Sequence, residues 1–160
     1  MASMIREPVT AYVALGANLG DAAGALREAV QSLAQTDGVS EVRCSGLYRS
    51  TPVDASGPDF INAVVELRTV LTAPDLLDAL QAIENHAGRL RPYRHAPRTL
   101  DLDLLLYGSA SVSSPRLTVP HPRMWQRAFV LVPLAELAPH LVSAHQLATV
   151  AEQVIESLEV

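Results

Sequence analysis

Cysteine and long apolar runs are scarce in this 160-residue chain. Cys44 is the single cysteine, which excludes a disulfide framework and a thiolate zinc site, and we expect it to be a small buried side chain. No apolar run reaches the roughly 18 residues that a membrane-spanning helix needs, and the N-terminus lacks the apolar segment of a signal peptide. We therefore expect a soluble, cytoplasmic protein that binds no membrane.

Basic residues are fewer than acidic ones, 12 against 17, and the formal net charge is −5. Nucleic-acid binding needs an extended basic surface, so nucleic acid is not an expected partner. A hydrophobic fraction of 49% with 18% charged residues is typical of a globular protein. The length fits one domain, which we expect to span residues 1–160.

The stretch from residue 98 to residue 107, RTLDLDLLLY, carries two acids in an otherwise apolar run that ends at Gly108. This pattern predicts a buried β-strand. Residues two apart share one face of a strand at a spacing of about 7 Å, so Asp101 and Asp103 point the same way. The leucines at positions 100, 102, 104 and 106 then face the opposite side and enter a core.

Two carboxylates on one side of a buried strand are costly unless positive charge meets them. They either pair with arginines on a partly exposed face or hold Mg²⁺, which takes carboxylate, water and phosphate oxygens. The preceding segment is rich in arginine, with Arg89, Arg91, Arg94 and Arg98. Arginines beside paired acids favour a site for a metal-bound polyphosphate.

The remaining pattern alternates strands with helices. Strands are predicted at residues 10–16, 39–49 and 60–69, and amphipathic helices at residues 22–36 and 72–88. Two helical pieces divided by Pro133 are predicted within residues 123–137, and residues 147–158 show the apolar stripe of a terminal helix. The order predicts an α+β sandwich with a mostly antiparallel sheet.

The segment Gly16-Ala17-Asn18-Leu19-Gly20 lies between the first strand and the first helix. A glycine-rich turn at this place can bind phosphate, but no Gly-Lys-Ser/Thr follows here. We interpret the glycines as providing turn geometry. His121, held between Pro120 and Pro122, is a candidate for a fixed contact with phosphate or ribose.

Six short segments together resemble one enzyme family. They are Gly16–Gly20, Tyr48-Arg49-Ser50-Thr51-Pro52, Phe60-Ile61-Asn62-Ala63, Gly88-Arg89, the stretch from Pro97 to Asp103, and Leu117-Thr118-Val119-Pro120-His121. In this order the chain resembles the 6-hydroxymethyl-7,8-dihydropterin pyrophosphokinases of folate synthesis, over residues 11–141. The resemblance implies a ferredoxin-like α/β sandwich and transfer of the β,γ-pyrophosphoryl group of ATP to the pterin, with release of AMP. It also implies two Mg²⁺ ions and a monomer acting on small molecules.

The resemblance implies a role for each matching position. Asp101 and Asp103 would bind both metal ions and, with Arg89 and Arg98, form the catalytic group. The ATP site would contain Gln81, Glu84, Arg89, Arg91, Arg98, Leu104, Arg116, Thr118, His121 and Arg127. The pterin site would contain Ser50, Thr51, Pro52, Val53, Phe60, Asn62, Asp101 and Phe129, with the two phenylalanines stacked on the ring.

The chain departs from the family pattern at three points. His95-Ala96 replaces a Trp-Gly pair found in many members, the arginine-rich loop is one residue shorter than in some, and Pro122 takes the place of an aromatic residue. Two other classes stay open from the residues alone. A nucleotidyl or glycosyl transferase could use the paired acids, and a ligand-sensing domain could pair them only with arginines.

Overall fold

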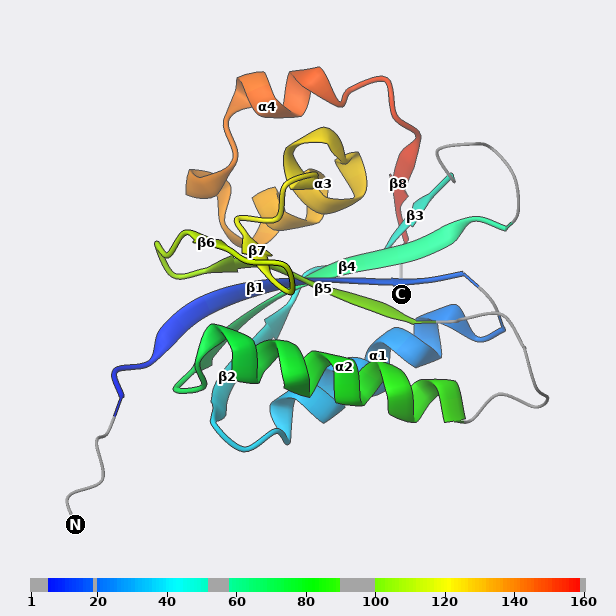
Figure 1. The fold of residues 1–160 in the computed structure, drawn as a ribbon. Helices are drawn as coiled ribbons and strands as arrows, with labels where there is room; N and C mark the ends of the chain where they lie inside the picture. Colours follow the sequence, from blue (N-terminus) through cyan, green and yellow to red (C-terminus); the bar gives the residue numbers. More distant parts are fainter. Residues whose placement is uncertain (1–5, 19, 52–57, 90–99, 159–160) are drawn as a thin grey trace, which may run out of the picture.

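The computed structural model describes residues 6–18, 20–51, 58–89 and 100–158, and it has three layers (Figure 1). A six-stranded sheet is covered on one face by α1 and α2 and on the other by α3, over which α4 lies. The strands are β1 (Val9–Ala17), β2 (Val39–Cys44), β3 (Tyr48–Ser50), β4 (Phe60–Thr69), β5 (Asp101–Tyr107) and β8 (Ile155–Ser157), and β6 (Val112–Ser113) and β7 (Thr118–Val119) form a separate hairpin. The helices are α1 (Ala22–Ala34), α2 (Ala73–Arg89), α3 (Ala128–Leu137) and α4 (Ala144–Thr149), with short 3₁₀ turns η1 (Met124–Gln126) and η2 (Pro139–Leu141).

The sheet has the order β5-β1-β4-β3-β8, and β2 pairs with β4 as well. All of these pairings are antiparallel. Two β-α-β units, β1-α1-β2 and β4-α2-β5, interleave so that β1 and β4 lie side by side at the centre. This is the ferredoxin-like arrangement, and the fold class predicted from the sequence is confirmed.

The sheet separates two hydrophobic cores. On one face, the stripes of α1 and α2 bury Leu26, Leu33, Leu76 and Leu80 against β1, β4 and β5. On the other face, α3 packs against the sheet through a second core that includes Leu131 and Leu134. The hydrophobic periodicity of residues 22–36 and 72–88 predicted the first layer well, because both helices turn only one face to the sheet.

The predicted strand at residues 39–49 is interrupted. Cys44 pairs with Val65 and Tyr48 pairs with Asn62. The three residues 45–47 therefore lie opposite only two residues of β4, 63 and 64. Ser45 occupies the resulting bulge, where its Oγ accepts a hydrogen bond from the Val64 N–H at 3.0 Å. Because a bulge bends the strand, β3 and its last residue, Ser50, take a direction that continuous pairing would not give.

A second register shift lies between β1 and β5, at Tyr12/Val13. Leu102 and Leu104 face the α1–α2 core as predicted, but Leu105 and Leu106 both belong to the α3 core. The prediction that Leu106 shares a face with Leu104 is therefore wrong. Asp101 and Asp103 precede the shift, so their shared orientation is unaffected.

The C-terminal third differs most from the sequence prediction. Pro133 lies inside α3 and does not divide it, and the interruption falls at Arg127, whose backbone is extended (φ −125°, ψ 114°). The apolar stripe of residues 147–158 does not form one helix, because α4 ends at Thr149 and β8 pairs with β3. Packing on the sheet outweighs local helix preference in both places. Among the described residues, none of the helices is long and apolar enough to cross a membrane.

Candidate active site

A cavity of about 410 Å³ lies between the sheet and the beginning of α3. Four strands and one helix segment contribute to it, and its lining residues are Ala14, Leu15, Gly16, Ser50, Thr51, Phe60, Asn62, Asp101, Asp103, Arg127 and Phe129. We call it the carboxylate cavity. It brings together six of the eight residues that resemblance assigned to the pterin and both predicted metal ligands.

The two carboxylates come from the start of β5. Asp101 lies opposite Gly16 and Asp103 opposite Ala14 in the β1–β5 pairing. Asp101 is exposed and Asp103 is partly buried, whereas the alternate residues Leu102 and Leu104 are buried on the other face. No group of three or more His, Cys, Asp or Glu side chains suited to a metal occurs among the described residues. Mg²⁺ takes carboxylate, water and phosphate oxygens, so this pair of carboxylates suits Mg²⁺.

A fixed amide forms the floor of the cavity. Asn62 is 4% exposed, and its Oδ1 accepts a hydrogen bond from the Ser50 hydroxyl at 2.5 Å. Gly16 belongs to β1, not to the predicted turn, and pairs with Asn62 on one side. A Cβ at Gly16 would lie 3.2 Å from Asn62 Nδ2, so glycine leaves the room that this amide needs.

Two aromatic residues line the cavity, one from the sheet and one from α3. Phe60 opens β4, and Phe129 lies in the first turn of α3. The Arg127 guanidinium stands 5.4 Å from the centre of the Phe129 ring, within cation–π range. Two rings and a fixed amide that line one cavity suit a flat heterocycle with a polar edge.

Five of the residues predicted to contact ATP lie on or beside α2, β5 and β7: Gln81, Glu84, Leu104, Arg116 and Thr118. Glu84 Oε2 accepts a hydrogen bond from the Leu102 N–H at 2.6 Å, which joins α2 to β5. Arg116 makes an ion pair with Asp78 and donates to Gln81 Oε1 at 3.3 Å. Thr118 is exposed on β7, whereas the Leu104 side chain is buried in the α1–α2 core.

His121 connects this group to the carboxylate cavity. The backbone N–H of His121 donates to the Leu105 carbonyl at 2.9 Å, and its ring Nδ1 accepts from the Arg123 backbone N–H at 3.1 Å. Burial lowers the pKa of His121, the Asp103 charge opposes that shift, and Arg127 and Arg123 lower the pKa further. The ring is therefore neutral at neutral pH, with its proton on Nε2.

Four predicted site residues, Pro52, Val53, Arg91 and Arg98, lie outside the described residues, and His95 and Ala96 do as well. Arg89 is the last residue of α2, one position beyond the predicted end at Gly88. The sequence prediction missed Ala14, Leu15 and Gly16 as lining residues. The signal for Gly16 was a glycine at the end of a strand pattern, which often marks close approach of another group.

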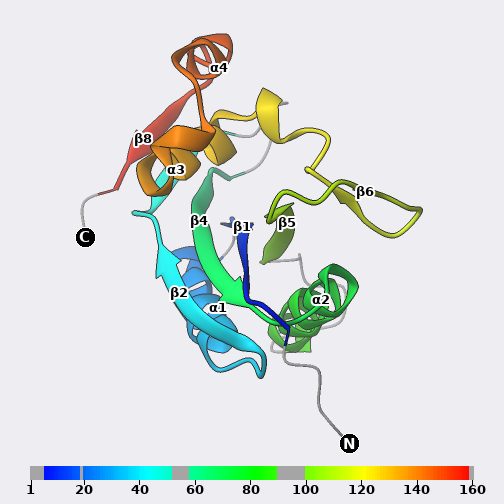
Figure 2. The same ribbon diagram turned by 90° about the vertical axis from the view of Figure 1, so that its left-hand side faces the viewer.

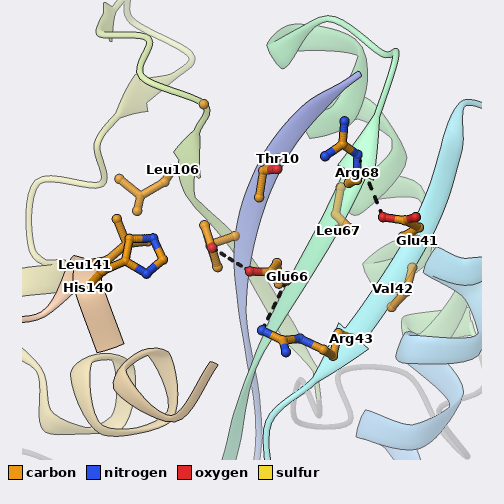
Figure 3. Close-up of a pocket in the computed structure, with 12 residues that line it drawn as sticks. Thr10, Glu41, Val42, Arg43, Glu66, Leu67, Arg68, Leu106, His140 and Leu141 are labelled. Atoms are coloured by element: carbon orange, nitrogen blue, oxygen red, sulfur yellow. Dashed lines mark hydrogen bonds and ion pairs between the residues drawn. The ribbon is translucent and has the colours of Figure 1, made fainter. Parts of the chain in front are cut away.

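A larger groove of about 720 Å³ lies on the part of the sheet that bears Thr10, Glu66 and Arg68 (Figure 3). Its charged residues pair with one another across β2 and β4: Arg43 with Glu66 at 3.3 Å and Arg68 with Glu41 at 3.8 Å. Tyr12 donates to Glu66 at 2.6 Å, and burial together with this carboxylate raises the tyrosine pKa. None of the predicted site residues that the structure describes lines this groove, so its size alone does not make it the active site.

The family model of 7,8-dihydro-6-hydroxymethylpterin-pyrophosphokinase matches residues 12–139. The 2-amino-4-hydroxy-6-hydroxymethyldihydropteridine pyrophosphokinase of Synechocystis sp. is 46% identical over 149 residues, which cover 93% of this chain and 76% of the relative. The enzyme of the same name from Pseudomonas aeruginosa is 50% identical over 131 residues, covering 81% of each chain.

Solved structures of Plasmodium falciparum HPPK-DHPS share the fold. One of them, with SDX-DHP, superposes with a TM-score of 0.68 at 14% identity, covering 86% of this chain and 43% of that chain. The present chain therefore spans about two fifths of the length of that longer protein. Together with the match over residues 12–139, these relatives show that the chain belongs to the 7,8-dihydro-6-hydroxymethylpterin-pyrophosphokinase family, whose activity is a transferase step of folate biosynthesis with ATP as co-substrate.

Proposed function

We propose that the carboxylate cavity is the place where this chain transfers the β,γ-pyrophosphoryl group of ATP to the hydroxymethyl group of 6-hydroxymethyl-7,8-dihydropterin. The observation that carries the proposal is the convergence of two unlike groups in one cavity. The paired carboxylates of β5 suit a metal-bound polyphosphate, and the Phe60–Asn62–Phe129 set suits a flat polar heterocycle.

The pterin lies between the rings of Phe60 and Phe129. Asn62 and the main chain of Ser50, Thr51, Pro52 and Val53 read its hydrogen-bonding edge, and Asp101 lies beside the hydroxymethyl group. Because the amide of Asn62 is buried and held by Ser50, a ligand without matching groups would leave it poorly paired. Such a mismatch costs more than the loss of apolar contact, so this wall sets specificity.

The ATP triphosphate lies on the β5 side of the cavity. Asp101 and Asp103 would hold the Mg²⁺, proposed as two ions, and the bound metal would supply neutralisation of the phosphate charge. The nucleotide rests against the group formed by Gln81, Glu84, Arg116, Thr118, His121 and Arg127, and against the main chain of Leu104, whose side chain is buried in the α1–α2 core. The neutral His121 offers Nε2–H as a hydrogen-bond donor to an anionic ligand.

The reaction joins the hydroxymethyl oxygen to the β-phosphorus and breaks the bond between that phosphorus and the oxygen of the α-phosphate. AMP leaves with that oxygen, and the hydroxyl proton passes to solvent. In such transfers the protein mainly positions the groups and stabilises charge. Arg89 and Arg98 serve this purpose on the phosphoryl oxygens, and Arg91 assists, because a guanidinium binds two such oxygens at once.

We propose one domain over residues 1–160 that acts as a monomer in the cytoplasm, on small molecules and not on nucleic acid. The continuous sheet supports a single domain, since β1 and β4 at its centre come from both interleaved units. The acidic net charge supports the absence of nucleic acid as a partner.

The product pattern tests the reaction. With purified protein, MgATP and 6-hydroxymethyl-7,8-dihydropterin, we expect AMP to form only when the pterin is present, in equal amount to the pterin diphosphate. Chromatographic separation of the nucleotides measures this. Pterin-dependent ADP would instead indicate transfer of a single phosphoryl group, and AMP with free pyrophosphate would indicate hydrolysis.

Replacing Arg98 with alanine tests its assignment as a catalytic residue. We expect kcat to fall by about a hundredfold or more while ATP affinity changes little, because the guanidinium meets the most charge in the transition state. Steady-state kinetics and equilibrium ATP binding separate the two effects. An increase in KM for ATP at unchanged kcat would make Arg98 a binding residue only.

A further inference from the structure

The C-terminal segment of residues 153–158 contacts both walls of the carboxylate cavity. This segment lies wholly outside residues 12–139, which the family model matches. In Figure 2 the strand β8 runs from the α4 side past α3 towards the edge of the sheet. The two walls are β3–β4, which carries Ser50 and Asn62, and the start of α3, which carries Arg127 and Phe129.

The first contact is made by the side-chain amide of Gln153. Its Oε1 accepts a hydrogen bond from the Ala128 N–H at 2.9 Å, and its Nε2 donates to the Gln126 carbonyl at 2.8 Å. These two peptide groups flank Arg127, so the amide pairs with the extended Arg127 backbone as a neighbouring strand would. Arg127 is the N-cap of α3 and has no side-chain capping bond, so Gln153 provides the partner for the first N–H of the helix.

The second contact begins two residues later. In the antiparallel pairing of β8 with β3, Ile155 lies opposite Ser50 and Glu156 opposite Arg49. Arg49 and Glu156 form an ion pair at 2.8 Å, and the Leu158 N–H donates to the Leu47 carbonyl at 2.9 Å. The wall that holds the Ser50–Asn62 hydrogen bond is therefore tied to the same segment that holds Arg127.

We propose that the 153–158 segment positions the two walls of the pterin site against each other, with Gln153 as the positioning residue for Arg127 and Phe129. The inference rests on the proposed function of the carboxylate cavity. Without the Gln153 bridge, the backbone around Arg127 samples other conformations in the free protein. Part of the free energy of pterin binding is then used to order this backbone. The measured pterin affinity falls in proportion to the fraction of free protein that is in the binding-competent conformation.

The test is Gln153→Met, which keeps the length of the side chain and removes both hydrogen bonds. We expect the Kd for the pterin to rise about tenfold, the scale of one or two lost hydrogen bonds, with the Kd for MgATP within about twofold of wild type. The matched control is Glu152→Met, since Glu152 is the exposed neighbour and its side chain makes no hydrogen bond or ion pair with the described part of the chain. We expect the control to bind both ligands as wild type does.

A ligand-free signal supplies an independent readout. Trp125 is the single tryptophan and lies in η1, one residue before Gln126. We expect Gln153→Met to change the fluorescence emission of Trp125 without pterin, and Glu152→Met to leave it unchanged.

In the double variant Gln153→Met/Phe129→Leu, the pterin Kd should rise by less than the product of the two single effects, since both act through the Phe129 ring.

Each outcome decides one proposal. If Gln153→Met has the same Kd for the pterin as the wild type, the positioning role is overturned and the proposed function stays intact. Equal losses of pterin and ATP affinity with a lower Tm would also overturn it, because they indicate general destabilisation. Failure of the wild-type chain to bind pterin would instead refute the proposed function. Should Gln153→Met not fold, Gln153→Glu retains the acceptor oxygen, and it must still weaken pterin binding for the proposal to stand.

Discussion

Asp103→Asn is expected to lower kcat by about a thousandfold or more, because the charge that holds the metal-bound triphosphate is removed at constant shape. Asp103 lies on the cavity face of β5, and its neighbours Leu102 and Leu104 enter the opposite core. The substitution therefore leaves packing intact. We expect the Tm to stay within a few degrees of wild type, or to rise, since Asp101 loses a neighbour of like charge.

The control for this prediction is Asp37→Asn, which removes one exposed carboxylate from the turn after α1. It changes the net charge by the same amount and should leave turnover unchanged. A Mg²⁺ titration of pterin-dependent AMP formation compares the three proteins. Turnover by Asp103→Asn near the wild-type level at ordinary Mg²⁺ would remove Asp103 from the metal site. Recovery only at high Mg²⁺ would mean that Asp103 contributes affinity and that Asp101 alone is sufficient for the chemistry.

Asn62→Leu is expected to weaken pterin binding by roughly a hundredfold while ATP binding is retained. The substitution keeps four side-chain heavy atoms branched at Cγ but removes the amide that the buried Ser50 hydroxyl fixes at 2.5 Å. Two costs follow: the substrate edge loses its partner, and Ser50, 5% exposed, loses its acceptor. An unsatisfied buried hydroxyl lowers the free energy of unfolding by about 1–3 kcal/mol.

The double variant Ser50→Ala/Asn62→Leu separates these two costs. Removing the hydroxyl together with its acceptor should recover much of the lost stability, since no unpaired group stays buried. Pterin affinity should stay low, because the amide is still absent. Calorimetry of pterin binding and thermal unfolding measure the two effects. Recovery of pterin affinity along with stability would show that Asn62 supports the wall and does not contact the substrate.

The sequence was sufficient for the features that depend on local periodicity. Alternation along residues 100–105 placed Asp101 and Asp103 on one face, because successive strand residues point to opposite sides. The apolar stripes of α1 and α2 predicted the layer that covers the other face. The six motif segments identified the family, and most of the residues assigned to the pterin meet in one cavity.

The sequence was not sufficient where the outcome depends on a distant partner. Residues 147–158 have a helical stripe, yet the outer edge of β3 recruits residues 155–157 as a strand. Pro133 has the local signature of a break, but the buried surface of α3 keeps the helix continuous. In both places non-local pairing or burial outweighs the few tenths of a kcal/mol per residue by which local preferences differ.

The geometry of the site shows the same division. Residue types and spacing named the carboxylates, the aromatic rings and the amide. The close approach of Asn62 to Gly16 and the bridge from Gln153 to the peptides around Arg127 exist only because the sheet and α3 bring remote segments together. Local sequence decides which face a side chain takes, since that follows from backbone period alone. The tertiary structure decides which faces meet, because strand edges and helix ends are satisfied by whichever partner the whole fold brings to them.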